Sequence, residues 1–157
     1  GTSREKLGEF EQHLSETMIG FDKVNQLRHV LFLKDMSGIA RHMARHAALL
    51  KPRFALTEKI LSKYLDGKRI GEWSRPNGGY FVSFDAIPGQ AKEIITLAAN
   101  VGVRLTPAGA TFPYGLDPED RNIRLAPTFP ALDSLQQALE VFVVCVQLAS
   151  VRHYLKS

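Results

Sequence analysis

The sequence predicts an α+β fold: a small mixed β-sheet with helices packed on one face, preceded by a long helical arm. Two observations support this class. Apolar residues recur at spacings of three and four through most of the first 66 residues, whereas the short β-type segments lie between residues 70 and 126. The expected order is helices, two strands, a helix, two further strands and a last helix. We therefore divide the 157 residues into a helical arm, 1–66, and a small α+β domain, 67–157.

Capping and spacing signals predict three helical segments in the arm, at 3–15, 22–34 and 39–65. Ser3 is a suitable N-cap for the first, and Gly20 interrupts the pattern before the second. The third would extend about 40 Å, and Pro52 inside it is expected to kink it or divide it in two. The arm has apolar faces but no sheet of its own, so we expect it to pack on a part of the protein outside this chain.

The small domain begins with a predicted β-hairpin. Residues 80–85 are aromatic and β-branched, and 70–75 is the expected partner across a Pro-Asn-Gly-Gly turn at 76–79. The remaining expected elements are a helix after Gly89 that ends near Asn100, short strands at 103–106 and 121–126, and a helix at 131–154. The irregular stretch 106–120 is long for a compact domain, and such loops are usually functional.

Composition excludes several classes of protein. The chain is 45% hydrophobic and 23% charged, which is typical of a globular domain rather than a disordered one. Its net charge of +4 is scattered, so no nucleic-acid surface is predicted. No apolar run is long enough to cross a membrane, and the single cysteine, Cys145, excludes an internal disulfide. We expect a cytoplasmic protein.

Arg124 is the candidate binding residue that the pattern itself supplies. In the predicted strand 121–126, Ile123 and Leu125 flank Arg124 and are expected to enter the core. Arg124 should therefore point out of the opposite face of the sheet. A guanidinium fixed on a strand matches the two oxygens of a carboxylate, although a surface residue or a structural ion pair is the alternative. His42 and His46 lie four residues apart on one helix, but without an intervening glutamate we predict no metal site.

Four segments together resemble the C-terminal portion of fold-type I aminotransferases, most closely a bacterial branch of the aspartate aminotransferases. They are 24–29 (Val-Asn-Gln-Leu-Arg-His), 76–81 (Pro-Asn-Gly-Gly-Tyr-Phe), 105–109 (Leu-Thr-Pro-Ala-Gly) and 122–127 (Asn-Ile-Arg-Leu-Ala-Pro). The resemblance covers nearly the whole chain from about residue 19, with order and spacing kept.

The resemblance implies a small domain that closes over a substrate held by a separate large domain. Arg124 would bind the substrate α-carboxylate, and Gly79 would belong to the turn that enters a central strand. Asn25 and Arg28 would reach toward the neighbouring active site of a homodimer. The intact enzyme would transfer amino groups between an amino acid and a 2-oxo acid, aspartate and 2-oxoglutarate by the resemblance, with pyridoxal 5'-phosphate as cofactor.

The family's cofactor lysine has no counterpart in this chain. Lys6 and Lys63 follow serines, yet both lie on predicted amphipathic helices and are expected to be surface residues. The chain alone is therefore predicted to hold no catalytic or cofactor-binding residue and to be inactive. Two other hypotheses stay open: an aminotransferase-like ligand sensor of a transcription regulator, and a free-standing interaction domain. The sequence does not identify the preferred amino donor.

Overall fold

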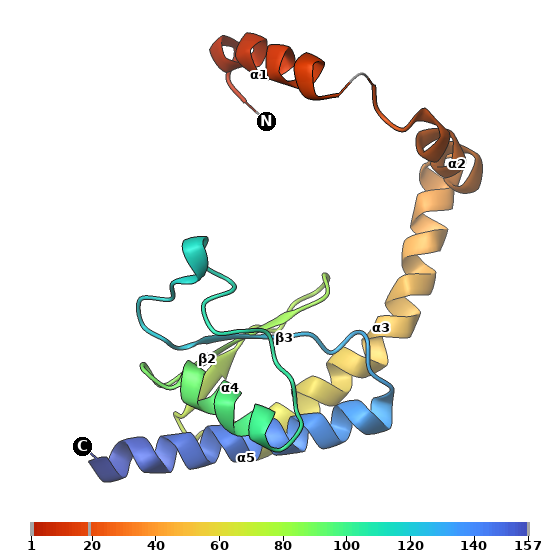
Figure 1. Cartoon of the computed structure of the whole chain (residues 1–157). Coiled ribbons are helices and arrows are strands. Elements are labelled where there is room, and N and C mark those ends of the chain that lie inside the picture. Colours follow the sequence, from red (N-terminus) through yellow and green to blue (C-terminus); the bar gives the residue numbers. More distant parts are fainter. Residues whose placement is uncertain (1, 19, 157) are drawn as a thin grey trace. The chain divides into compact units, whose positions relative to one another are not determined.

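The computed structural model describes residues 2–18 and 20–156, and the chain forms two compact units, 1–46 and 47–157. The first unit contains α1 (Arg4–Thr17), α2 (Lys23–Leu33) and the beginning of α3 (Met36–Leu65) (Figure 1). α1 follows Ser3 as predicted, although the Ser3 side chain makes no capping hydrogen bond. α2 is capped by Asp22, whose Oδ1 accepts a hydrogen bond from the Asn25 N–H at 2.9 Å.

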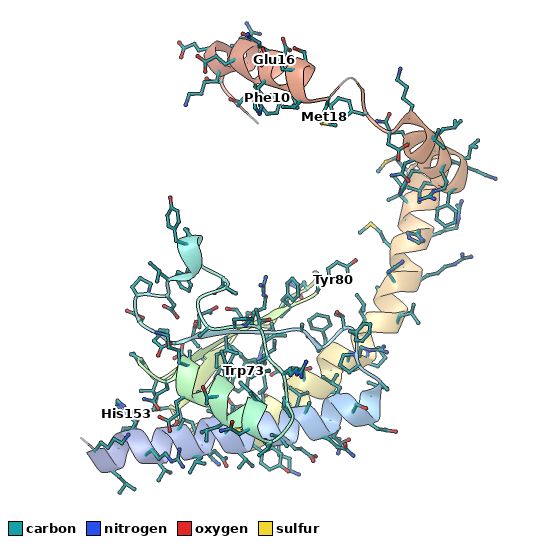
Figure 2. The ribbon with its side chains drawn as sticks, viewed as in Figure 1. Phe10, Glu16, Met18, Trp73, Tyr80 and His153 are labelled. Carbon is teal, nitrogen blue, oxygen red and sulfur yellow. The ribbon has the colours of Figure 1, made fainter. Side chains whose placement is uncertain are left out.

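The first unit has no core of its own. None of the residues described between 2 and 46 is buried. Most of its large apolar side chains are instead exposed: Leu7, Phe10, Met18, Phe21, Val24, Leu27, Val30, Leu31, Phe32, Met36 and Met43. Figure 2 shows Phe10 and Met18 projecting from the ribbon. The helices of this unit therefore present apolar surface that no described residue covers.

α3 continues through Pro52 as one helix, so the expected division into two helices does not occur. Pro52 has no N–H to donate, which leaves this turn short of one hydrogen-bond donor. The Arg53 side chain supplies donors beside it: Nη1 donates to the Leu49 carbonyl at 2.7 Å, and Nε donates to the Pro130 carbonyl at 3.1 Å.

The second half of α3 belongs to the small domain, which corrects the expectation that the arm has no sheet to cover. Thr57, Ile60, Leu61 and Leu65 of α3 are buried in the core. The compact units meet at 46/47, whereas the boundary predicted from sequence, 66/67, follows the end of α3. The division into an arm, 1–66, and a small domain, 67–157, stays a prediction for the natural protein.

The sheet has three strands in the order β1-β2-β3: β1 (Gly71–Trp73), β2 (Val82–Ala86) and β3 (Asn122–Leu125). Both pairs are antiparallel, with Trp73 opposite Phe84 and Phe84 opposite Ile123. The α+β class and the hairpin are thus confirmed. The sequence predicted a mixed sheet, but both strand pairs among the described residues are antiparallel.

The strand predicted at 103–106 is the element that fails to form. The Val103 N–H donates to the Ala98 carbonyl at 2.9 Å, across Gly102, whose φ is +88°. These residues therefore terminate α4 (Ala91–Asn100) instead of pairing with a strand. The chain continues as irregular backbone to a short 3₁₀ turn, η1 (Pro113–Gly115), and then to β3.

The core of the small domain lies between one face of the sheet and the helices. α4, α5 (Leu132–Lys156) and the second half of α3 all lie on the same side of the sheet (Figure 1). Phe84 is fully buried at the centre, with its ring centroid 5.0 Å from that of Phe142 and 6.5 Å from that of Trp73. Gly71 packs against this ring so closely that a Cβ there would collide with Phe84.

α5 is the one helix in the described part of the chain that is long and apolar enough to suit a membrane span, contrary to our expectation of none. Its buried residues are those that pack into the core: Leu135, Leu139, Phe142, Val143, Cys145, Val146, Ala149 and Ser150. A core helix passes the same test, so its composition is weak evidence for a membrane.

Candidate functional site

The face of the sheet away from the helices carries polar side chains. Strand alternation places Val82, Phe84 and Ile123 in the core and the residues between them on the opposite, open face. The register brings the open-face residues together, with Ser83 opposite Arg124 and Asp85 opposite Asn122. The sheet therefore gathers hydroxyl, carboxylate, amide and guanidinium groups side by side.

Arg124 lies on this open face, as alternation predicted. It is half-buried, and its Cζ lies 4.9 Å from the centroid of the Phe81 ring. The three ion pairs found among the described residues join other side chains, and no hydrogen bond of the Arg124 guanidinium is observed there. The structural ion pair that we weighed as the alternative is thus not formed in the described part of the chain. The N–H donors of Arg124 are available to a carboxylate from outside.

Asn122 is hydrogen-bonded to Asp85, the carboxylate on the open face that lies diagonally across from Arg124. Its Nδ2 donates to Asp85 Oδ1 at 2.7 Å and to Ser83 Oγ at 2.9 Å. Its Oδ1 accepts a hydrogen bond from Thr111 Oγ1 at 2.7 Å, which ties the irregular 106–120 segment to the strand. This amide therefore fixes Asp85 and links the long loop to the open face.

Asp117 fixes the backbone at the start of β3. Its carboxylate accepts hydrogen bonds from the N–H groups of Glu119 at 3.0 Å and of Arg121 and Asn122 at 2.8 Å each. Partial burial raises the pKa of Asp117, but these backbone hydrogen bonds outweigh it and hold the pKa below its ordinary value. The carboxylate thereby anchors the strand that carries Arg124.

Replacing Asp117 by alanine is expected to lower the free energy of unfolding by about 1–2 kcal/mol at pH 7, because three N–H groups lose their acceptor. The folded-state pKa lies below the unfolded one, so this contribution is present above the unfolded pKa, near 4, and disappears as the pH falls through the folded pKa. Urea titrations at several pH values measure it. An equal difference at pH 2 and pH 7 would contradict the assignment, and the exposed Asp66→Asn variant is the control.

The structure places the other candidate residues in two groups. Gly79 lies in the connection between β1 and β2 with a φ of +90°, a conformation that favours glycine, two residues before Phe81. Figure 2 shows the adjoining Tyr80 at the end of this hairpin. Asn25 and Arg28 lie together on α2, where Arg28 Nη2 donates to Asn25 Oδ1 at 2.8 Å. Arg28 therefore already has a local partner.

Neither of the two lysines that follow a serine lies in a setting that suits a pyridoxal phosphate site. Lys6 and Lys63 are exposed helix residues, and the Lys63 ammonium lies 4.7 Å from the Tyr64 ring centroid. Neither lysine lines the cavities found in the two units. His42 and His46 stack edge to face at 4.5 Å, and no cluster of three or more potential metal ligands occurs in the described ranges.

A cavity of about 160 Å³ in the small domain is lined in part by Arg124. Most of its walls are apolar, and Leu125, Leu139 and Phe142 among them face the core. Leu125, Leu139 and Phe142 lie on the core side of the sheet, whereas alternation gives Arg124 to the open face, so the cavity borders both sides of β3.

Several residues of this site were not candidates from the sequence, among them Phe81, Asn122 and Asp117. Alternation around Ser83 could have placed Phe81 on the open face, because both positions are odd-numbered in the same strand segment. The partners of Asn122 and Asp117 depend on the strand register and the loop path, for which the sequence carries no comparable signal.

Comparison with known proteins bears on the class of protein that has this fold and site. A crystal structure of an aspartate transaminase from Corynebacterium glutamicum superposes with a TM-score of 0.89 at 39% identity, covering 98% of this chain and 36% of that one. An α-aminoadipate aminotransferase from Thermus thermophilus, at 16% identity, shares the fold with a TM-score of 0.75 over 96% of this chain and 37% of its own.

Sequence relatives agree. A Mycolicibacterium smegmatis protein named as an aminotransferase is 45% identical over 150 residues, and an aspartate aminotransferase of Corynebacterium glutamicum is 39% identical over 153. These alignments cover 96% and 98% of this chain but only 35% of each relative. The family model described as aspartate amino-transferase matches residues 1–157. The chain belongs to this aminotransferase family, and it spans about a third of the length of the curated relatives it matches.

Proposed function

We propose that this chain is the part of an aminotransferase that closes over the amino-acid substrate and binds its α-carboxylate through Arg124. The observation that carries the proposal is a half-buried guanidinium on a rigid strand, facing away from the core and without a carboxylate partner among the described residues. Its planar fork donates two parallel hydrogen bonds to a carboxylate and stays charged at any physiological pH. Loss of amino-group transfer on removal of this guanidinium from the full-length protein is the test.

The reaction of the full-length protein that we propose is transfer of the amino group of aspartate to 2-oxoglutarate. The aspartate aminotransferase of Corynebacterium glutamicum supports this choice at 39% identity. Both substrates carry an α-carboxylate, so one arginine serves the two half-reactions. The relatives named above are enzymes, which favours an enzyme over the ligand-sensing regulator.

Pyridoxal 5'-phosphate is the proposed cofactor of the full-length protein, where it supplies the electron sink for amino-group chemistry. A structure of the Thermus thermophilus neighbour contains a phosphopyridoxyl derivative of leucine. Since neither Lys6 nor Lys63 lies in a setting that suits the group, we propose that residues outside this chain hold it. The contribution of the residues described here is to bind and orient the substrate carboxylate.

The proposed partners of the first unit are the remainder of the longer protein and a second subunit of a homodimer. The described residues of the first unit include eleven exposed large apolar side chains, nine of them on α1, α2 and the beginning of α3, such as Leu27 and Leu31. Contiguous apolar surface of more than a few hundred Å² usually has a partner. Asn25 and Arg28 lie on the same helix, so a partner that covers α2 would bring a second active site to them.

The chain of 157 residues on its own is therefore expected to self-associate through residues 4–46 or to leave these helices unprotected. Light scattering and amide hydrogen exchange measure the two outcomes. The double substitution of Leu27 and Leu31 by glutamate should reduce any self-association, whereas Gln26→Glu on the same helix should not. A strictly monomeric chain with uniformly protected amides in both helices would contradict the proposal.

A further inference from the structure

We propose that Phe81 is a positioning residue for Arg124, which holds the guanidinium ready for the substrate carboxylate and away from Asp85. This inference rests on the proposed function of Arg124. The register of β2 and β3 sets up the relationship: Ser83 lies directly opposite Arg124, and Phe81 and Asp85 are the residues two positions to either side of Ser83. Both are diagonal neighbours of Arg124 on the same face of the sheet, within reach of a long side chain.

Arg124 therefore has two competing neighbours, an aromatic ring and a carboxylate. In the structure its Cζ lies over the Phe81 ring at 4.9 Å from the centroid, and it forms no ion pair with Asp85. Asp85 Oδ1 instead accepts the hydrogen bond from Asn122. The ring and the amide together keep the two opposite charges apart.

Contact with a ring suits an arginine that must bind a carboxylate. The cation is attracted to the face of the ring, and this attraction uses none of the five N–H donors of the guanidinium. An arginine side chain otherwise loses much rotamer freedom when it binds a ligand, and holding it beforehand reduces that loss. Phe81 is 48% exposed, so the ring is not a core residue whose main role is packing.

The test is a set of Phe81 variants of the full-length protein that contains this chain. Phe81→Leu and Phe81→Met remove the ring but keep apolar bulk, and Phe81→Tyr and Phe81→Trp keep a ring. We expect the ring-free variants to raise KM for both the amino acid and the 2-oxo acid about three- to tenfold, with kcat changed by less than about twofold. The aromatic variants should stay within about twofold of the wild type.

Two further variants separate positioning from a structural role. Adding Asp85→Asn to Phe81→Leu should lower the raised KM again, because the competing carboxylate is gone while the amide oxygen still accepts from Asn122. Adding Phe81→Leu to Arg124→Ala should have no further effect on kcat/KM, because the residue that the ring positions is absent. Thermal melts of every variant report folding independently.

The outcomes separate this inference from the proposed function. If Arg124→Ala retains wild-type kcat/KM, the proposed function fails. If Arg124→Ala loses activity while both ring-free variants keep wild-type KM, Arg124 remains the receptor and the positioning role of Phe81 is refuted. An effect of Phe81→Leu that is equally large in the Arg124→Ala background would also refute it.

Discussion

Replacement of Arg124 by alanine in the full-length protein is expected to reduce kcat/KM by about two to three orders of magnitude. Charge-assisted hydrogen bonds each contribute about 1.5–3 kcal/mol, and a bidentate pair supplies two of them. The substrate carboxylate would enter the closed site without a partner, so the loss includes the cost of leaving that charge unpaired. Steady-state kinetics with aspartate and 2-oxoglutarate measure the change.

Arg124→Lys should recover little of this activity, because an ammonium cannot reproduce the planar fork. The thermal melts of both variants should match the wild type within a few degrees, because the side chain leaves the core face and forms no ion pair among the described residues. Arg104→Ala, at an exposed arginine of the same domain, is the matched control. Wild-type kcat/KM in Arg124→Ala would place the carboxylate receptor elsewhere, and an unfolded variant would restore the structural interpretation of Arg124.

The hairpin shows what the sequence predicts reliably. The Pro-Asn-Gly-Gly turn allows a positive φ, which Gly79 adopts, and the aromatic and β-branched residues after it form β2. The strand expected at 103–106 shows the opposite case. Its apolar residues are suitable for a strand, but Gly102 terminates α4 by a hydrogen bond that occupies the Val103 N–H. Local capping outweighs a short strand propensity, and composition alone does not contain that competition.

α3 illustrates a second limit of sequence patterns. Its spacing predicted a helix of about the right length, but the same apolar stripe serves two environments. Leu61 and Leu65 are buried under the sheet, whereas Met43 near the other end is exposed. Periodicity shows that one face is apolar and does not show what covers it. For that reason the domain boundary placed at the end of α3 differs from the boundary between compact units at 46/47.

The candidate site also combines a feature that the sequence predicts with contacts that it does not predict. Alternation within one strand was enough to place Arg124 on the open face. The contacts that define its surroundings cross between strands and join residues 37 or more positions apart, as in the hydrogen bonds from Asn122 to Asp85 and to Ser83. Such contacts depend on register, and a shift of one residue would put every side chain on the other face. The resemblance to a family suggested a role for Arg124 but gave no information on Phe81 or Asp117.

The open face and the core are also coupled, because β2 contributes alternate side chains to each of them. Phe84 is completely buried and contacts the rings of Phe142 and Trp73, while its neighbours Ser83 and Asp85 lie on the open face, Ser83 directly opposite Arg124. Truncating Phe84 to alanine is expected to lower the free energy of unfolding of the small domain by about 3–5 kcal/mol, since it removes buried apolar surface and leaves a cavity. Urea denaturation followed by the fluorescence of Trp73 measures the change.

Val144→Ala on α5 is the matched control, because Val144 is 60% exposed and its truncation should cost less than about 0.5 kcal/mol. The Phe84 variant should also weaken carboxylate binding, because a relaxed β2 no longer holds Ser83 and Phe81 in register with Arg124. Phe84→Leu retains most of the apolar volume and should lose about half as much stability or less.

Equal stabilities of the Phe84→Ala and Val144→Ala variants would show that the ring contacts of Phe84 do not hold β2 in place. The support of Arg124 would then have to come from the hydrogen bonds of Asn122 and Asp117.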